Sequence, residues 1–381
     1  MRLTCTGAPC ANAYASGAHI VPNEERPKMR MEMVWRISLA LLLIVASTGL
    51  ASCRSGRSGP QAAAEPAGGP DFRVEPAERE ELVSAVLAEL DAKYVFPEIA
   101  AKNRPELAKR WSDDSMKAMT SGNAIMQRVN ADLAALFHDK HVSLMPRSAI
   151  PEAMLHEEAE PTAADLERMA KFEVSHGFGI ERAEILPGNV GYLVLHHFPY
   201  VKVPGMEQAA RDAMASIADS SALIVDLRHN GGGDGDTLAL FLSYLFDRKM
   251  LLAESYDRLS GKTVQEWTRE EVSGKRYGAS RPVFVLTSRR TFSAAEGFSY
   301  AVQTLKRGTI VGETTGGGGH YCALAKVGKQ FVLSVAIGFS KSPVTNTNWD
   351  GVGVKPDVEA EADRALDVAM GLVRKAASSK N

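Results

Sequence analysis

From about residue 188 the chain alternates short apolar runs with amphipathic segments, and this alternation constrains the fold more than any other feature. Runs typical of buried strands are "NVGYLVLHHF", "SALIVDLR", "PVFVLTS" and "GTIVGE". Helical spacing lies between them, in "VPGMEQAARDAMASIAD", "DTLALFLSYLF" and the segment after Ser293. Two more strands are predicted at "YCALAKV" and "QFVLSVAIG", before a C-terminal amphipathic helix. This order of elements predicts an α/β core with a mostly parallel sheet.

The segment before this core has a different pattern. From residue 77 to about Phe137, apolar residues such as Leu82, Val86 and Leu90 recur at helical spacing. We therefore predict a small bundle of about three helices as an N-terminal subdomain, residues 77–146. A loop-rich connecting segment, 147–187, leads to the core, 188–381. Residues 54–76 are rich in Gly, Pro, Ala and Ser, which is typical of a flexible linker.

Residues 1–53 are expected to form a leader and signal peptide. Lys28, Arg30 and Arg36 precede an apolar run that is followed by small residues, and the run is short for a membrane span. The run ends in "LASC", which resembles the lipobox of bacterial lipoproteins, where the cysteine, here Cys53, is lipidated. The alternative is an ordinary signal peptide that happens to end in cysteine. The lipobox interpretation predicts a lipid-anchored protein of the bacterial cell envelope, on the periplasmic side or the outer surface.

Composition excludes several classes of function. The formal net charge of −2 provides no basic excess to neutralise nucleic-acid phosphates. Only Cys322 of the four cysteines follows Cys53, so one mature chain has no disulfide and no cysteine-rich zinc site. A dinucleotide fingerprint that starts at Gly231 fails because Asp236 stands where a glycine is needed, and a P-loop that starts at Gly312 fails because Gly318 replaces the lysine. No cofactor and no metal are expected, and the oligomeric state stays open.

Ser293 follows one predicted strand and precedes a predicted helix. With Glu296 it forms the S-x-x-E pattern of a capping box, which is a purely structural role. A nucleophilic serine at this place needs a base, an acid that orients the base, and N–H donors for an oxyanion.

Several histidines are candidate bases. His141, in "LFHDKHVSL", lies where the helical part ends and a strand-like segment begins. Histidine is the usual side chain for a base that works near neutral pH. Local pattern does not choose between His141 and its rivals, which are His138, His196, His197, His229 and His320.

Two glycine-rich loops and one acidic loop complete the set of candidates. "DLRHNGGGDGD" and "GETTGGGGH" are either tight turns or anion holes built from backbone N–H groups. Asp350, in "NTNWDGVGVKPDV", is either a turn residue or the carboxylate that orients a histidine.

Six segments in order resemble the serine peptidase family that includes C-terminal processing peptidases, the tricorn core and the interphotoreceptor retinoid-binding protein. They are "DKHVSL", "NVGYLVLHHF", "ALIVDLRHNGGG", "VFVLTSRRTFSAAEGFSYAVQ", "IVGETTGGGG" and "NWDGVGVKPD". The resemblance covers roughly residues 77 to 365. It implies a crotonase/Clp-protease-like α/β core preceded by the helical bundle.

The resemblance also implies a mechanism. C-terminal processing peptidases use a lysine downstream of the serine, but "VGETTGGGGHYC" contains none, and the interval before the core is unlike a PDZ domain. The chain therefore looks like the PDZ-lacking tricorn or retinoid-binding-protein branch. The resemblance to that branch implies that Ser293 is the nucleophile and that His141 is the general base. Asp350 stands where a glutamate is usual, and the N–H groups of Gly232 and Ala294 would form the oxyanion hole.

The expected function is that of an exported serine peptidase that hydrolyses proteins or peptides. The alternative is a non-catalytic binding protein for apolar ligands or peptides on the same fold, since fold alone does not fix function. The presence of Ser293, His141 and Asp350 together favours the enzyme, because a binding protein would not need all three.

Overall fold

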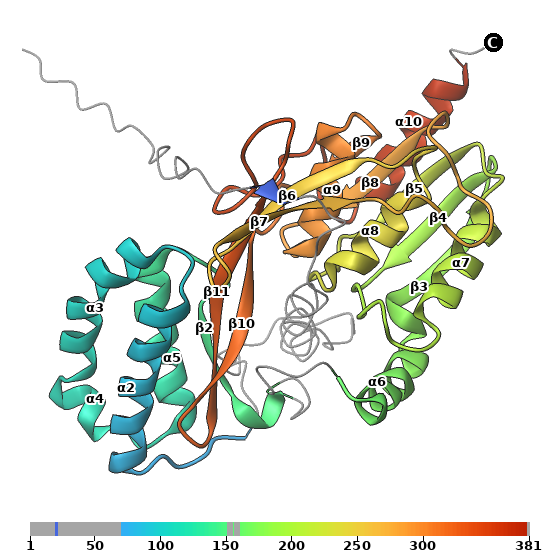
Figure 1. The fold of residues 1–381 in the computed structure, drawn as a ribbon. Helices are drawn as coiled ribbons and strands as arrows, with labels where there is room; N and C mark the ends of the chain where they lie inside the picture. Colours follow the sequence, from blue (N-terminus) through green and yellow to red (C-terminus); the bar gives the residue numbers. More distant parts are fainter. Residues whose placement is uncertain (1–19, 22–69, 151–154, 156–160, 379–381) are drawn as a thin grey trace, which may run out of the picture.

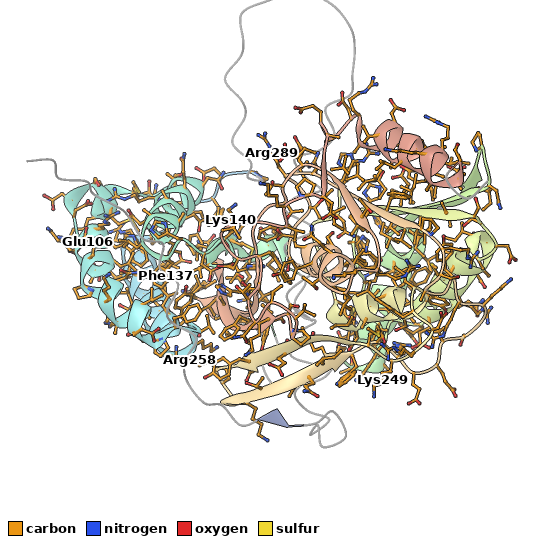
Figure 2. All side chains as sticks on the ribbon, turned by 90° about the horizontal axis from the view of Figure 1, so that it is seen from above. Glu106, Phe137, Lys140, Lys249, Arg258 and Arg289 are labelled. Atoms are coloured by element: carbon orange, nitrogen blue, oxygen red, sulfur yellow. The ribbon has the colours of Figure 1, made fainter. Side chains whose placement is uncertain are left out.

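The computed structural model describes residues 20–21, 70–150, 155 and 161–378. The signal peptide and Cys53 lie outside the described residues, as does most of the predicted linker. Figure 1 shows a helical bundle at one end of the molecule and an α/β core at the other, joined by long strands. In Figure 2 the labelled Glu106 and Lys249 lie toward the bundle and core ends, and Lys140 lies between these two parts.

The N-terminal helices are present as predicted. Pro76 and Pro97 begin the first two of them, where the missing N–H group of proline costs nothing. Asp113 and Ser121 cap the next two through side-chain oxygens that accept backbone N–H groups. The helices are α2 (Pro76–Lys93), α3 (Pro97–Trp111), the single-turn α4 (Asp114–Ala118) and α5 (Gly122–Phe137).

The core contains the mostly parallel sheet, which is confirmed. Its strand order is β12-β9-β8-β5-β4-β3, and only the β3–β4 pair is antiparallel. Every residue of β4, β5 and β8 is buried, as expected for strands covered on both faces. The strands are β3 (Ile180–Leu186), β4 (Val190–Leu195), β5 (Ala222–Asp226), β8 (Val283–Thr287), β9 (Thr309–Gly312) and β12 (Val358–Glu359).

Helices cover both faces of this sheet. The side chains of one face pack with the first three core helices, and those of the other face pack with the last helix of the chain. These helices are α7 (Met206–Ile217), α8 (Gly235–Ser243), α9 (Ala294–Thr304) and α10 (Ala365–Ser378).

A second, largely antiparallel sheet connects the core to the bundle, and its extent was not predicted. Its order is β1-β7-β6-β11-β10, with β2 also paired to β11. Residues of β10 and β11 pack against the apolar side of the helical bundle. Charged residues such as Glu254 and Lys262 interrupt the apolar pattern of β6 and β7, so these half-exposed strands gave no clear signal. The strands are β1 (Ile20–Val21), β2 (Ser143–Pro146), β6 (Leu251–Asp257), β7 (Lys262–Trp267), β10 (His320–Val327) and β11 (Phe331–Lys341).

Two segments differ from the expected organisation. Ile20–Val21, within the predicted leader, pairs with β7 in parallel. The predicted connecting segment contains α6 (Ala163–Ser175), whose start is fixed by a capping box of Thr162 and Asp165, and β3, which belongs to the core sheet. Within the described residues, no helix has the length and apolar character needed to cross a membrane.

Candidate active site

Ser293 occupies a sharp turn between β8 and α9. Its backbone angles are φ 52° and ψ −120°, a region that residues other than glycine rarely adopt. Such strain persists only where the surroundings impose it, and it is concentrated at functional sites. The turn places the side chain at the N-terminal end of α9, where the first backbone N–H groups of a helix have no partner within the helix and can bind an anion.

His141 is the histidine that faces Ser293. Its Nε2 lies 3.3 Å from Ser293 Oγ, although 152 residues separate them in the chain. The imidazole is buried and stacks on the ring of Phe292 at 4.9 Å between centroids. α5 ends at Phe137, and the left-handed φ of 54° at the next residue, His138, turns the chain toward His141. The structure therefore brings together the two residues on which the predicted mechanism depends.

The rival histidines lie elsewhere. His138 has a backbone role as the C-cap of α5. His196 pairs with Glu181, and His197 pairs with Glu173 at 2.9 Å; the ring of His229 lies 6.3 Å from that of His196. Of these histidines, only His320 approaches the site, through its contact with Asp139, which lies on the Nδ1 side of His141.

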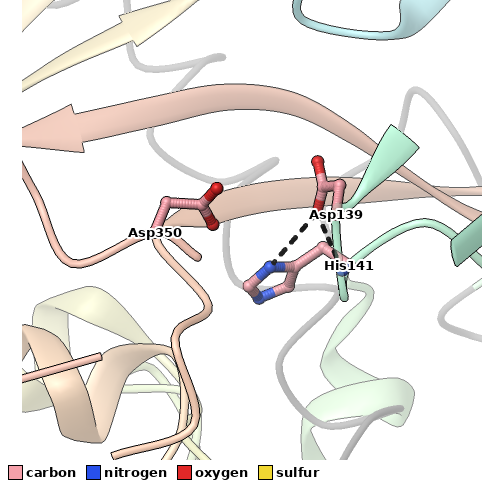
Figure 3. A group of neighbouring side chains, drawn as sticks. All are labelled: Asp139, His141 and Asp350. Atoms are coloured by element: carbon pink, nitrogen blue, oxygen red, sulfur yellow. Dashed lines mark hydrogen bonds and ion pairs between the residues drawn. The ribbon is translucent and has the colours of Figure 1, made fainter. Parts of the chain in front are cut away.

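Among the described residues, Asp139 is the carboxylate nearest to the Nδ1 atom of His141, and sequence reasoning missed it. Its Oδ1 lies 3.9 Å from Nδ1 and accepts the backbone N–H of His141 at 2.9 Å. The predicted partner, Asp350, makes no hydrogen bond to His141. Asp350 Oδ1 instead accepts the N–H of Gly319 at 2.8 Å, and Oδ2 lies 3.7 Å from His320 Nε2. Figure 3 shows both carboxylates on the Nδ1 side of the His141 ring.

His320 links these two carboxylates. Its Nδ1 lies 2.8 Å from Asp139 Oδ2, and both side chains are buried. Burial lowers the pKa of His320, but the hydrogen bond and charge of Asp139 and the charge of Asp350 outweigh it and raise that pKa overall. Burial raises the pKa of Asp139, but its interactions with His320 and His141 lower it overall. Both pKa shifts favour the charged forms of these two side chains.

His141 itself is kept neutral. Burial lowers its pKa to about 4, and the nearby charge of Asp139 only partly offsets this effect. A neutral imidazole can accept a proton at Nε2, which is what a general base for Ser293 must do.

The first glycine-rich loop packs directly on the serine. A Cβ atom at Gly232, which has φ of 115°, would lie 2.8 Å from the Cβ of Ser293, so only glycine fits there. The N–H of Gly232, however, donates to Asn230 Oδ1 at 2.8 Å. The predicted oxyanion donor at Gly232 is therefore already engaged. The next residue, Gly233, lines a cavity together with Ser293 and Ala294.

The second glycine-rich loop binds carboxylates of this chain. Glu296, buried in the first turn of α9, accepts the N–H groups of Gly317 at 2.6 Å and Gly318 at 2.8 Å. It also accepts the N–H of Ser293 at 2.9 Å. Gly318 approaches so closely that a Cβ atom would lie 2.6 Å from the ring of His141. Glu296 thus connects the turn at Ser293 with the loop that packs against His141.

A cavity of about 110 Å³ opens beside Ser293. Its wall is mainly apolar and includes Leu238, Leu252, Tyr300 and Trp349. It has the size and character to receive a side chain of a bound ligand next to the serine.

A serine on a strand–helix turn whose hydroxyl faces a buried neutral imidazole is the arrangement that serine hydrolases use. The profile of peptidase family S41 matches residues 189–360, which make up most of the core. The family match begins after His141 and Asp139, so their assignment depends on the geometry described above.

Individual relatives are distant. The carboxy-terminal-processing protease of Bartonella bacilliformis is 24% identical over 198 residues, which cover 48% of this chain and 43% of that protein. The tricorn protease of Thermoplasma volcanium is 29% identical over 132 residues, 34% of this chain and 11% of that protein. The chain therefore spans less than half the length of these two relatives. A solved protein from Parabacteroides merdae, 18% identical, shares the fold with a TM-score of 0.53 over 77% of this chain and 96% of its own.

Proposed function

We propose that the chain is a serine peptidase that hydrolyses peptide bonds with Ser293 as nucleophile and His141 as general base. The observation that carries this proposal is the 3.3 Å approach of His141 Nε2 to Ser293 Oγ at a strained strand–helix turn. His141 takes the hydroxyl proton as Ser293 attacks the carbonyl carbon, and later gives a proton to the leaving amine. Water then hydrolyses the acyl-enzyme by the same route.

Asp139 is the proposed acid of this mechanism. When His141 becomes charged during attack, the nearest negative charge is Asp139, and His320 holds that carboxylate in place. Asp350 contributes a second, more distant negative charge to the same region. Together they stabilise an imidazolium that would otherwise be costly in a buried position.

The proposed oxyanion hole uses the N–H groups of Ala294 and Gly233. Ala294 is the first residue of α9, so its N–H has no partner within the helix. The carbonyl of Gly232 accepts the N–H of Phe198 at 2.9 Å, and in a trans peptide the N–H of Gly233 points the opposite way. These donors would stabilise the negative charge of the tetrahedral intermediate.

The apolar cavity beside Ser293 favours substrates with a small or medium apolar side chain next to the cleaved bond. Profiling with a peptide library tests this preference; consistent cleavage beside charged residues would contradict it.

We also propose export and lipid anchoring through Cys53, which stays a prediction from the sequence. Incorporation of radioactive palmitate, lost in Cys53→Ala, tests it.

A fluorophosphonate probe tests the nucleophile. We expect labelling of the full-length protein that disappears in Ser293→Ala and falls steeply in His141→Ala, while both variants keep the wild-type melting temperature to within a few degrees. Peptide hydrolysis should be lost in parallel. Folded wild-type protein that neither reacts with the probe nor cleaves a peptide library would favour the non-catalytic binding alternative.

A further inference from the structure

The Nδ1 side of His141 has an unusual environment. Nδ1 is buried, and no described residue forms a hydrogen bond with it. Because Nε2 faces Ser293, Nδ1 points to the other side of the ring, toward Asp139 and Asp350 (Figure 3). An unpartnered buried nitrogen that faces two carboxylates is a costly arrangement unless a proton or a cation completes it.

The three side chains have the spacing of a loose metal site. One ligand atom from each of Asp139, His141 and Asp350 lies within 4.8 Å of the other two, and Asp139 Oδ1 lies 3.9 Å from Nδ1. Zinc–nitrogen and zinc–oxygen bonds are about 2.0–2.2 Å long, so a shift of about 1 Å in the carboxylates would close the site. Asp350 is the most exposed of the three, with 21% of its side chain accessible, and can move most easily.

Neighbouring groups already orient both carboxylates. His320 holds Oδ2 of Asp139 and leaves Oδ1 on the side of His141. The N–H of Gly319 holds Oδ1 of Asp350. A fixed outer hydrogen bond on a ligating carboxylate is a common property of protein metal sites. One imidazole nitrogen and two carboxylate oxygens are a ligand set that suits Zn²⁺.

We propose that Asp139, His141 and Asp350 form an inhibitory zinc site behind the catalytic base. The effect on activity rests on the proposed peptidase function. A neutral imidazole carries one ring proton, and zinc binds through the lone pair of Nδ1, so that proton resides on Nε2. Nε2 can then only donate to Ser293 Oγ and cannot take its proton. Bound zinc therefore switches the base off without blocking the substrate cavity.

Calorimetric titration of Zn²⁺ into full-length Ser293→Ala protein tests the site without any need for activity. We expect one ion per chain, with affinity weakened at least about tenfold in the additional variant Asp350→Asn. The matched control is His196→Ala, which removes an exposed histidine that pairs with Glu181 outside the site, and should leave the affinity unchanged. Asp350→Asn is preferred to Asp139→Asn because Asp139 is fully enclosed.

Three results would overturn the proposal. The first is no saturable zinc binding to folded protein at micromolar to millimolar Zn²⁺. The second is equal affinity with and without Asp350→Asn. The third is much tighter binding to the wild type than to Ser293→Ala, which would place the ion between Nε2 and the serine hydroxyl.

Peptide hydrolysis then tests the inhibitory effect. Zn²⁺ should suppress wild-type turnover, a chelator should restore it, and Asp350→Asn should need at least about ten times more Zn²⁺ for the same inhibition. Zinc that binds at the predicted residues while turnover continues would refute inhibition. If the wild type shows no hydrolysis at all, the proposed function fails, while the calorimetric result still decides whether the site exists.

Discussion

At the residue scale, the proposed mechanism depends on which carboxylate, that of Asp139 or that of Asp350, stabilises the charged form of His141. Asp139 has the closer oxygen, lies two residues away on the same loop, and is held by His320. Asp350 accepts the N–H of Gly319 with Oδ1, and its Oδ2 lies 3.7 Å from His320 Nε2. It makes no hydrogen bond to His141. The family resemblance implies a glutamate at position 350, and aspartate is one methylene shorter. We therefore propose that Asp139, two residues before His141, has the acidic role instead of Asp350.

This assignment predicts unequal effects of neutralising the two carboxylates. Asp139→Asn should lower kcat/KM by about 10²–10⁴-fold, because the imidazolium formed during attack loses its nearest counter-charge. Asp350→Asn should lower kcat/KM by less than about tenfold. Steady-state kinetics of the two variants against the same peptide give the comparison, and circular dichroism and melting temperature show whether each variant is folded.

The reverse order of effects would assign the acidic role to Asp350. Such a result would mean that the loop around Trp349 and Asp350 moves toward His141 when substrate binds. Asp350→Glu is then informative, since the longer side chain should raise kcat/KM only if the carboxylate reaches Nδ1.

At the scale of elements, the N-terminus of α9 connects the serine turn with the second glycine-rich loop. Glu296 accepts the N–H of Ser293 and also those of Gly317 and Gly318, so one carboxylate positions the backbone of Ser293 and the loop beside His141. Thr315 Oγ1 adds a fourth donor at 2.5 Å. The capping role and the nucleophilic role proposed for this turn are compatible because Glu296 binds the backbone of Ser293, while the hydroxyl faces His141.

The burial of Glu296 predicts a pH-dependent stability. Burial raises the pKa of Glu296 from 4.5 to about 7, although its four hydrogen bonds oppose this shift. Between these values the folded protein keeps a proton that the unfolded chain has lost. The free energy of unfolding should therefore fall as pH rises through this window, by at most on the order of 3 kcal/mol, and stay low above pH 7.

Glu296→Gln isolates this contribution. The amide does not titrate, so the variant should lack the fall between about pH 4.5 and 7. Above pH 7 it should be less stable than the wild type, because an amide cannot accept the four donors that the carboxylate accepts. Urea unfolding of both proteins at several pH values measures the difference. If the unfolding free energies of the two proteins change with pH in parallel, Glu296 stays ionised throughout. The effect of its hydrogen bonds on its pKa then outweighs the effect of burial.

The elements of the core could be predicted from sequence because burial on both faces leaves continuous apolar runs, as in β4, β5 and β8. Ser293 and His141 could be predicted as candidate nucleophile and candidate base from the family resemblance. The strands β6 and β7 and the roles of Asp139 and His320 could not be predicted. Half-exposed strands carry mixed residues, and the contact between Asp139 and His320 joins positions 181 residues apart. A signal was nonetheless present, since Asp139 precedes His141 in "DKH".

At the scale of the whole molecule, the candidate active site combines residues from the helical bundle's side and from the α/β core. His141 follows the bundle, whereas Ser293 belongs to the core, so their 3.3 Å contact depends on how the bundle sits on the antiparallel sheet. Arg258, just after β6, donates to the carbonyl oxygens of Asp91 and Tyr94 at the end of α2. Tyr94 packs edge-on against Phe137, with ring centroids 4.8 Å apart, and Phe137 is the last residue of α5 before the turn that leads to His141.

This chain of contacts predicts that Arg258→Ala lowers activity from a distance. Loss of the two hydrogen bonds should loosen the bundle on the sheet and misplace His141, at a cost of about 0.5–2 kcal/mol in transition-state stabilisation, or roughly 2- to 30-fold in kcat/KM. The rate is measured well below the melting temperature and divided by the concentration of serines that react with a fluorophosphonate, so that unfolded protein is not counted. Arg269→Ala is the matched control, because Arg269, which follows β7, forms an ion pair with Glu207 of α7, outside the bundle. Equal kcat/KM in both variants would show that the contact between bundle and sheet tolerates the loss of Arg258, and that the loop from His138 to His141 fixes the base without help from the bundle.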